Sequence, residues 1–140
     1  MIHVLLYGPE YRPNLSSMIR TAEFYGCDRV YIYDKNNLLL PPEHSKKARA
    51  DMAHMAKVWT AGAIDHIEVV KVEDIDDFLN QHHGRIVGTM VDPTAKVLHS
   101  FAFEEGDLIL WALKKRDCLT QSYHLSMNQY ICQIKEIHLV

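Results

Sequence analysis

Several features that mark large classes of protein are missing from this sequence. Its 140 residues contain no apolar run near the length of a membrane span, and the N-terminus lacks the basic and then apolar layout of a signal peptide. The three cysteines are odd in number and form no C-x-x-C pair, so we expect reduced thiols and a cytoplasmic protein without membrane contact. The nine histidines show no paired ligand spacing, and we therefore expect no metal site.

Strong positive charge and the common nucleotide-binding fingerprints are also absent. Lys and Arg number 15 against 18 Asp and Glu, giving a net charge of −3, so any contact with nucleic acid must come from a local patch. There is no G-x-G-x-x-G and no Walker loop. A flavodoxin-like nucleotide-binding domain is disfavoured because its phosphate loop has no counterpart here.

The hydrophobic pattern that is present predicts an α/β fold. Apolar residues make up 48% and charged residues 24% of the chain, as in an ordinary globular domain. Strands and helices are expected to alternate, which favours one parallel sheet with helices on both faces. Ligands of such sheets bind at the carboxyl ends of the strands. The expected strands are 2–7, 28–33, 67–72, 85–90 and 107–111, and the expected helices are 14–26, 45–57 and 73–81.

The segment from Asn14 to Gly26 carries the clearest helix signals. Asn14 stands where an N-cap belongs, and Gly26 stands where a left-handed residue would end the helix. An apolar stripe recurs at helical spacing, at Leu15, Met18, Ile19 and Ala22. Arg20 falls on the polar face and should project away from the core. Considered alone, Asn14 would only cap the helix, and Arg20 would only pair with Glu23 one turn later.

The same segment resembles the first signature motif of the SpoU (TrmH-like) RNA 2′-O-ribose methyltransferases, a branch of the knotted SPOUT superfamily. The family pattern is an Asn, then Arg-Thr-Ala six residues later, then an aromatic-Gly pair, and Asn14, 20–22 and 25–26 match it. Ser16 departs from it, because the family often has Gly there. Further likenesses are the small-residue turn 60–63, the strand end Gly88-Thr89 and the strand 108–110.

The resemblance implies a SPOUT-like α/β knot fold, a homodimer, and methyl transfer from S-adenosylmethionine to tRNA or rRNA. It assigns the catalytic site to Arg20, which would act on the nucleotide phosphate and hydroxyl, with support from Asn14. An arginine suits that role because it stays charged and offers a planar fork to phosphate. The implied cofactor-binding residues are Gly88, Thr89, Leu110 and Ala112. The candidate RNA-binding residues, besides Arg20, are Arg12, Lys46, Lys47 and Arg49, each of which could instead be plain surface charge.

The resemblance stops after Trp111. The family's second motif, Gly-x-Glu-x-x-Gly-Leu, should follow there, but residues 112–119 read Ala-Leu-Lys-Lys-Arg-Asp-Cys-Leu. The third motif begins Ser-Leu-Asn, and we regard Ser126-Met127-Asn128 as a coincidental likeness because no small residues follow it. We therefore expect a methyltransferase core over residues 1–111, a divergent tail over 112–140, and an incomplete C-terminal knot.

The genetic code offers a cause for this abrupt change. Suppose that the reading frame starts at the third base of the Trp111 codon. Whatever synonymous codons the gene uses, the first codon of this shifted frame then encodes Gly and the seventh encodes Leu. The third can be Glu and the sixth can be Gly, which restores the second motif in register. The hypothesis is that residues from about Ala112 onward are an out-of-frame tail. The alternative is ordinary divergence of a degenerate paralogue.

Two functions follow from the sequence. The first is an active SpoU-type RNA 2′-O-ribose methyltransferase. The second is a catalytically inactive, truncated SPOUT-like module that binds RNA or a protein partner without cofactor. They differ in whether the cofactor pocket exists, and the residues after Trp111 favour the second.

Overall fold

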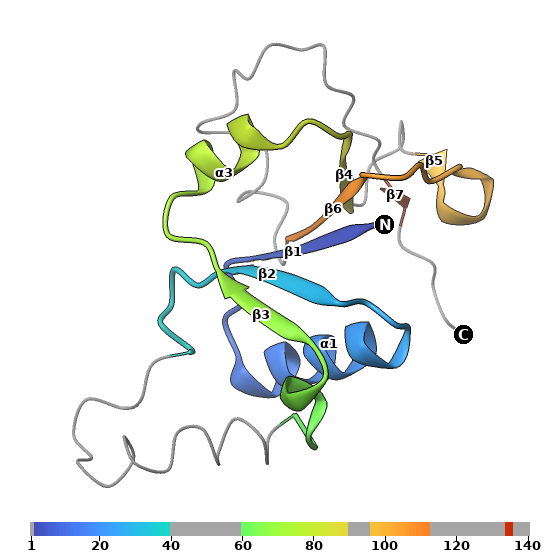
Figure 1. The fold of residues 1–140 in the computed structure, drawn as a ribbon. Helices are drawn as coiled ribbons and strands as arrows, with labels where there is room; N and C mark the ends of the chain where they lie inside the picture. Colours follow the sequence, from blue (N-terminus) through green and yellow to red (C-terminus); the bar gives the residue numbers. More distant parts are fainter. Residues whose placement is uncertain (1, 40–59, 90–95, 113–133, 136–140) are drawn as a thin grey trace, which may run out of the picture.

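The fold is given by a computed structural model that describes residues 2–39, 60–89, 96–112 and 134–135 (Figure 1). The helices are α1 (Arg12–Phe24) and α3 (Ile75–Gln81), with short 3₁₀ turns η1 (Ala63–Asp65) and η2 (Leu98–Ser100). The strands are β1 (His3–Tyr7), β2 (Arg29–Tyr33), β3 (Glu68–Lys71), β4 (Ile86–Thr89), β5 (Lys96–Val97), β6 (Leu108–Ala112) and β7 (Ile134–Lys135).

The strands form one seven-stranded sheet in the order β3-β2-β1-β6-β4-β7-β5, and every neighbouring pair is parallel. β1 is an interior strand: Leu5 lies beside Tyr31 of β2 on one side and Leu110 of β6 on the other. This confirms the predicted parallel α/β sheet. The predicted knot and the helix over 45–57 lie outside the described residues.

One face of the sheet is covered by α1 (Figure 1). Leu15 and Ile19 of this helix pack against Leu6, Val30 and Ile32 of β1 and β2, and all five side chains are buried. Successive strand residues point to opposite faces, so alternate positions of the same strands serve the other side. The continuous apolar runs in the sequence therefore reflect strands that are buried on both faces.

The other face is covered by α3. Its Ile75 and Leu79 pack with Leu5, Leu108 and Leu110 in a second buried cluster. The two helices thus lie on opposite faces, as the sequence predicts for a layered α/β domain (Figure 1).

The prediction that Asn14 caps α1 is wrong. The helix begins at Arg12, Tyr11 holds the N-cap position, and no side chain caps this end. Pro13 explains the earlier start, because a proline in the first turn has its φ preset and needs no N–H partner there. The helix ends at Phe24, two residues before the predicted end, but the predicted left-handed glycine is confirmed: Gly26 has φ 77°, its N–H donates to Glu23 O at 2.9 Å, and Cys27 N–H donates to Ala22 O at 2.9 Å.

Other predicted boundaries shift by one or two residues. α3 begins at Ile75 instead of residue 73, because the Asp74 carboxylate accepts from Asp77 N–H at 3.0 Å and so acts as the N-cap. The turn at 60–63 is confirmed, with Ala61 and Gly62 both in the left-handed region. β5, η2 and β7 were not predicted, since two- and three-residue elements leave no periodicity to detect.

Candidate functional site

The carboxyl ends of β4 and β6 bring the four candidate cofactor residues together. Gly88 of β4 pairs in register with Leu110 of β6, Thr89 is level with Trp111, and Ala112 lies beside Tyr7 at the end of β1. Gly88 and Leu110 are buried, and the Leu110 side chain belongs to the core under α3. Any ligand at this edge would therefore meet the backbone where these strands end.

The order in which strands are added to the sheet reverses beside β1. After β1 the chain continues to β2 on one side, whereas β6 lies on the other side of β1 next to β4. Loops that leave neighbouring strands in opposite directions open a crevice between them, and such a switch point is the usual ligand site of an open α/β sheet. The candidate site thus lies at the carboxyl ends of β1, β6 and β4.

Polar contacts fix the loops beside this switch point. The buried Asp34 carboxylate accepts from the N–H groups of Leu38 and Leu39, at 2.8 Å each. The Asn36 amide donates to Pro9 O at 2.8 Å, and Arg12 Nε donates to Leu38 O at 3.0 Å. The loops after β1 and β2 and the first turn of α1 are therefore held together. Sequence reasoning missed Asp34 and Asn36, although Asp and Asn after a strand are a known turn signal.

Two tyrosines and a lysine lie at the ends of β1 and β2. Tyr7 and Tyr33 are level in the sheet, and their ring centroids are 5.1 Å apart with 44° between the ring planes. Lys35 Nζ lies 5.3 Å from the centroid of the Tyr7 ring. The lysine stem passes over Gly8, where a Cβ would come within 2.5 Å of Lys35 Cε. Gly8 has φ 60°, so both its space and its conformation favour glycine.

The exposed face of α1 carries the two candidate catalytic residues. Asn14 and Arg20 are both exposed, and they lie about 9 Å apart along the helix at 1.5 Å per residue. Within the described part of the chain, no ion pair joins Arg20 to Glu23. At the end of the helix, Phe24 and Tyr25 are 80% and 79% exposed, with ring centroids 5.4 Å apart.

Arg20 and the cofactor candidates do not lie on neighbouring elements. α1 packs under β1 and β2, whereas Gly88 and Leu110 belong to β4 and β6 on the far side of β1. Arg12, in contrast, lies at the carboxyl edge, where it is half-buried. Lys46, Lys47 and Arg49 are outside the described residues, so their predicted contact with RNA is not placed.

A buried ion pair holds β4 and β6 together at the opposite, amino-terminal edge. Arg85 donates to Asp107 through Nε at 2.8 Å and Nη2 at 2.7 Å, and its Nη1 lies 2.7 Å from Glu104 Oε1. The Arg85 bonds hold the pKa of the Asp107 carboxyl below its usual value. The Asp107 side chain is only 1% exposed, and the backbone of Leu108 donates to Arg85 O at 2.8 Å.

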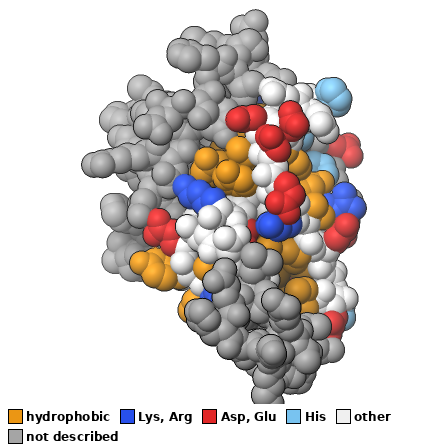
Figure 2. Space-filling model, turned by 90° about the vertical axis from the view of Figure 1, so that its left-hand side faces the viewer, with side chains coloured by type: hydrophobic (Ala, Val, Ile, Leu, Met, Phe, Trp, Pro, Cys, Tyr) orange, Lys and Arg blue, Asp and Glu red, His pale blue; other side chains and the backbone are white. Residues whose placement is uncertain are grey.

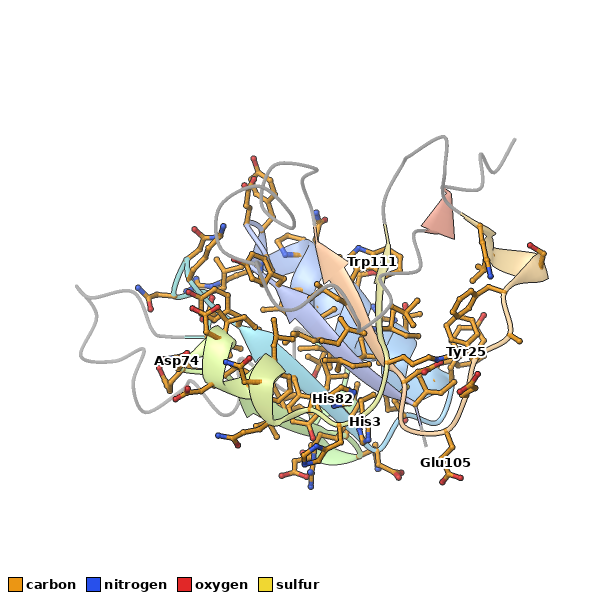
Figure 3. All side chains as sticks on the ribbon, turned by 90° about the horizontal axis from the view of Figure 1, so that it is seen from above. His3, Tyr25, Asp74, His82, Glu105 and Trp111 are labelled. Atoms are coloured by element: carbon orange, nitrogen blue, oxygen red, sulfur yellow. The ribbon has the colours of Figure 1, made fainter. Side chains whose placement is uncertain are left out.

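A shallow hollow of about 200 Å³ at the same edge is lined by His3, Tyr31, Phe78, Gln81 and His82. His3 and His82 lie next to each other, with ring centroids 6.3 Å apart (Figure 3). Burial and the nearby His3 lower the pKa of His82, and no group of the described residues forms a hydrogen bond with its buried Nε2. In the described ranges, no three His, Cys, Asp or Glu side chains are grouped as a metal site would require. None of the helices in those ranges combines the length and the hydrophobicity needed to span a bilayer.

The fold defines an α/β protein with an open parallel sheet, and proteins of this class usually bind ligands at the carboxyl ends of the strands. The family within that class is shown by sequence: the chain belongs to the SpoU rRNA Methylase family, whose model matches residues 1–111. This confirms the resemblance carried by the first motif. The match ends at Trp111, the residue after which the second motif is missing.

Solved structures with the same fold include two from named bacteria. The A. aeolicus TrmH/SpoU tRNA modifying enzyme has TM-score 0.62 and 14% identity, covering 81% of this chain and 53% of that one. The SpoU methyltransferase AviRb from Streptomyces viridochromogenes, in complex with AdoMet, has TM-score 0.61 and 16% identity, covering 98% and 51%.

A third structure, described as giving insight into 2-OH methylation of C/U34 on tRNA, has TM-score 0.59 and 20% identity, covering 82% of this chain and 69% of that one. At these identities the likeness shows the fold alone. The chain spans about half the length of the first two structures. No curated protein matches the chain significantly.

Proposed function

We propose that this chain carries the core of an S-adenosylmethionine-dependent RNA methyltransferase that acts on the ribose 2′-hydroxyl of tRNA or rRNA. The observation that carries the proposal is the family match over residues 1–111. It is supported by the placement of Gly88, Thr89, Leu110 and Ala112 at adjacent strand ends beside the switch point.

The site residues fit a cofactor that is held mainly by backbone. Gly88 and Leu110 are buried and paired in register, so Thr89 and Ala112 stand at the carboxyl edge as the last residues of β4 and β6. S-adenosylmethionine would supply an electrophilic methyl group there, and AviRb, a protein with this fold, was solved with AdoMet. The chain's own task is to place the acceptor hydroxyl in line with that methyl group and to help it lose its proton.

Arg20 and Asn14 are assigned to that task. Arg20 is exposed and makes no ion pair with Glu23 in the described residues, so its guanidinium is available to an RNA phosphate. Because α1 and the ends of β4 and β6 are separate, we infer a homodimer in which the α1 face meets a second copy. The exposed Phe24 and Tyr25 would supply apolar contact area at that interface.

The divisions of the chain are part of the proposal. Residues 1–111 form the methyltransferase core, and residues 112–140 are a tail read out of frame. The family match ends where the shifted frame would begin, which supports this division. The nucleotide sequence tests it: a frame shifted at the Trp111 codon should encode Gly-x-Glu-x-x-Gly-Leu. A shifted frame without Glu and Gly codons at those positions, or with an early stop, would leave divergence as the explanation.

The second candidate function is an inactive SPOUT-like module that binds RNA or a protein partner. It is favoured by the loss of the second motif after Trp111, the residue at which the family match ends. Both candidates use the same fold, and they differ only in whether cofactor binds.

Calorimetry with S-adenosylmethionine and the purified 140-residue chain separates the two. Micromolar binding that is lost in Thr89→Arg and kept in Arg20→Ala would support the cofactor site, and transfer of a labelled methyl group to tRNA or rRNA should then depend on Arg20. If the folded chain binds no cofactor, the methyltransferase proposal fails for this chain and the inactive module remains.

A further inference from the structure

The tyrosines at the ends of β1 and β2 form an aromatic surface at the carboxyl edge. Tyr7 and Tyr33 are both half-buried, and they pack on one side against the core cluster under α3 that includes Leu5 and Leu110. Hydrophobic side chains reach the surface on this side of the molecule, beside basic and acidic ones (Figure 2). An apolar core could be sealed by leucine or valine at these two positions, so the core alone does not explain two aromatic rings in contact.

Lys35 places a positive charge beside this surface. Its Nζ lies over the Tyr7 ring at 5.3 Å, and the absence of a side chain at Gly8 lets its stem pass close to the loop after β1. The preceding residue, Asp34, is buried, and both of its carboxylate oxygens accept backbone N–H groups of the same loop. The loop that carries Lys35 is therefore fixed, and Lys35 itself is an exposed residue.

Carboxylates at the same edge of the sheet limit where a phosphate group could bind. Asp74, Asp76 and Asp77 lie at the start of α3, which follows the carboxyl end of β3. A phosphate would be repelled by these carboxylates and attracted to the Lys35 ammonium group. Bases stack on aromatic side chains whatever their sequence, and a neighbouring cation that tracks the backbone completes the usual single-strand site.

We propose that Tyr7, Tyr33 and Lys35 form a subsite for one nucleotide of the RNA, with the base against the tyrosine pair and the phosphate on Lys35. The subsite lies next to the switch point between β1 and β6, so the nucleotide it holds is a neighbour of the one that enters the reaction site. This inference rests on the proposed function, because it assumes that the ligand at this edge is RNA.

The test is the affinity of the full chain for a fluorescently labelled single-stranded RNA, measured by anisotropy over a range of salt concentrations. Tyr33→Leu keeps apolar packing but cannot stack, and it should weaken binding roughly 5- to 150-fold, the range for losing one stacked base. Tyr33→Phe should bind within about twofold of the wild type, because the ring is kept. Thermal unfolding of each variant checks that the fold is intact.

Lys71 offers a matched control for Lys35. It ends β3 at the same edge of the sheet, and its Nζ pairs with Glu73 at 2.9 Å. Lys35→Gln should reduce the slope of log K against log salt by about 0.7 to 1, the change expected for one lost phosphate contact, while Lys71→Gln leaves the slope unchanged. RNA that contains 4-thiouridine should crosslink to Tyr7 or Tyr33 when it is irradiated.

The outcomes separate this inference from the proposed function. If RNA binding depends on Tyr33 and Lys35 but the chain transfers no methyl group, the subsite is supported and the proposed methyltransferase activity is refuted. The subsite is overturned if wild-type chain does not bind the RNA, if Tyr33→Leu binds as well as Tyr33→Phe, or if Lys71→Gln changes the slope as much as Lys35→Gln. Competition by free adenosine monophosphate at the same affinity would identify a mononucleotide site and overturn RNA as the ligand.

Discussion

Replacing Arg85 with methionine should destabilise the sheet strongly, because it leaves a buried carboxylate without its partner. Met keeps the apolar stem but removes both hydrogen bonds to Asp107, which is 1% exposed. Breaking a buried pair from one side costs about 3–5 kcal/mol. The Arg85 side chain is 28% exposed, so water can partly replace it, and we expect the lower end, about 3 kcal/mol.

Urea unfolding at pH 7 measures this loss, with an unchanged m-value showing that the unfolded surface is the same. The pH dependence of the free energy of unfolding is a second test. The pKa of Asp107 is depressed in the folded state, so its contribution is complete above the unfolded value near 3.9 and is lost as the pH falls below it. Without Arg85, burial makes the Asp107 carboxyl of the variant bind a proton more readily than that of the wild type, so the difference between the two proteins should already shrink as the pH falls towards 4 and should be smallest at the most acid pH.

A loss below about 1 kcal/mol at pH 7 would refute this account, because it would mean that Asp107 is solvated or finds another partner. Asp107→Asn is the companion variant. It removes the charge but can still accept one bond from Arg85, so it should cost less than Arg85→Met. The pair also matters for the site, because Arg85 and Leu108 fix the register of β4 and β6, which presents Gly88 beside Leu110 at the other edge.

Three further predictions concern local features. Gly26→Ala should lower the free energy of unfolding, measured in urea, by about 1 kcal/mol, because alanine disfavours a φ of 77°. The added Cβ has no atom within 4 Å, so no steric clash adds to this cost, and Gly26→Asn should cost less because asparagine tolerates this conformation better. Asp34→Ala should cost roughly 1–3 kcal/mol because it leaves loop N–H groups unpaired, with partial rescue by Asp34→Asn. The pKa of His82 lies below its usual value, so the unfolded chain takes the proton first and stability should fall as the pH drops below about 6.5. His3→Asn should raise the pKa of His82 in an NMR titration, since the neighbouring imidazole helps to lower it.

Local patterns predicted what depends on local chemistry. The buried strands, the apolar stripe of α1 and the left-handed Gly26 follow from residue type and spacing, and the structure confirms them. The start of α1 was misplaced because Asn14 and Pro13 both carry helix-start signals, and the proline sets the boundary. Gly88 and Leu110 were named from the family resemblance, and only the strand order shows that they are neighbours.

The remaining features depend on contacts between segments far apart in the sequence. No local signal places β6 between β1 and β4, since strand order is set by how whole strands pack. Nothing in the sequence distinguishes Arg85 and Asp107 from other charged residues, and their ion pair forms only because the sheet brings them together. The Tyr7 and Tyr33 rings each read as strand residues, and their contact appears only when β1 and β2 are paired.

The position of β1 between β2 and β6 has a consequence for synthesis. β1 is made first, and its partner β6 only when residue 112 has been added. At about 5–20 residues per second, the edge of β1 that β6 will cover stays open for on the order of ten seconds. Unpaired strand edges recruit other chains, so released chains truncated before Leu108 should aggregate more readily than released chains that end after Ala112. Whatever frame is translated beyond Trp111, the residues of β6 from Leu108 to Trp111 stay the same, and these pair with His3 to Leu6 of β1.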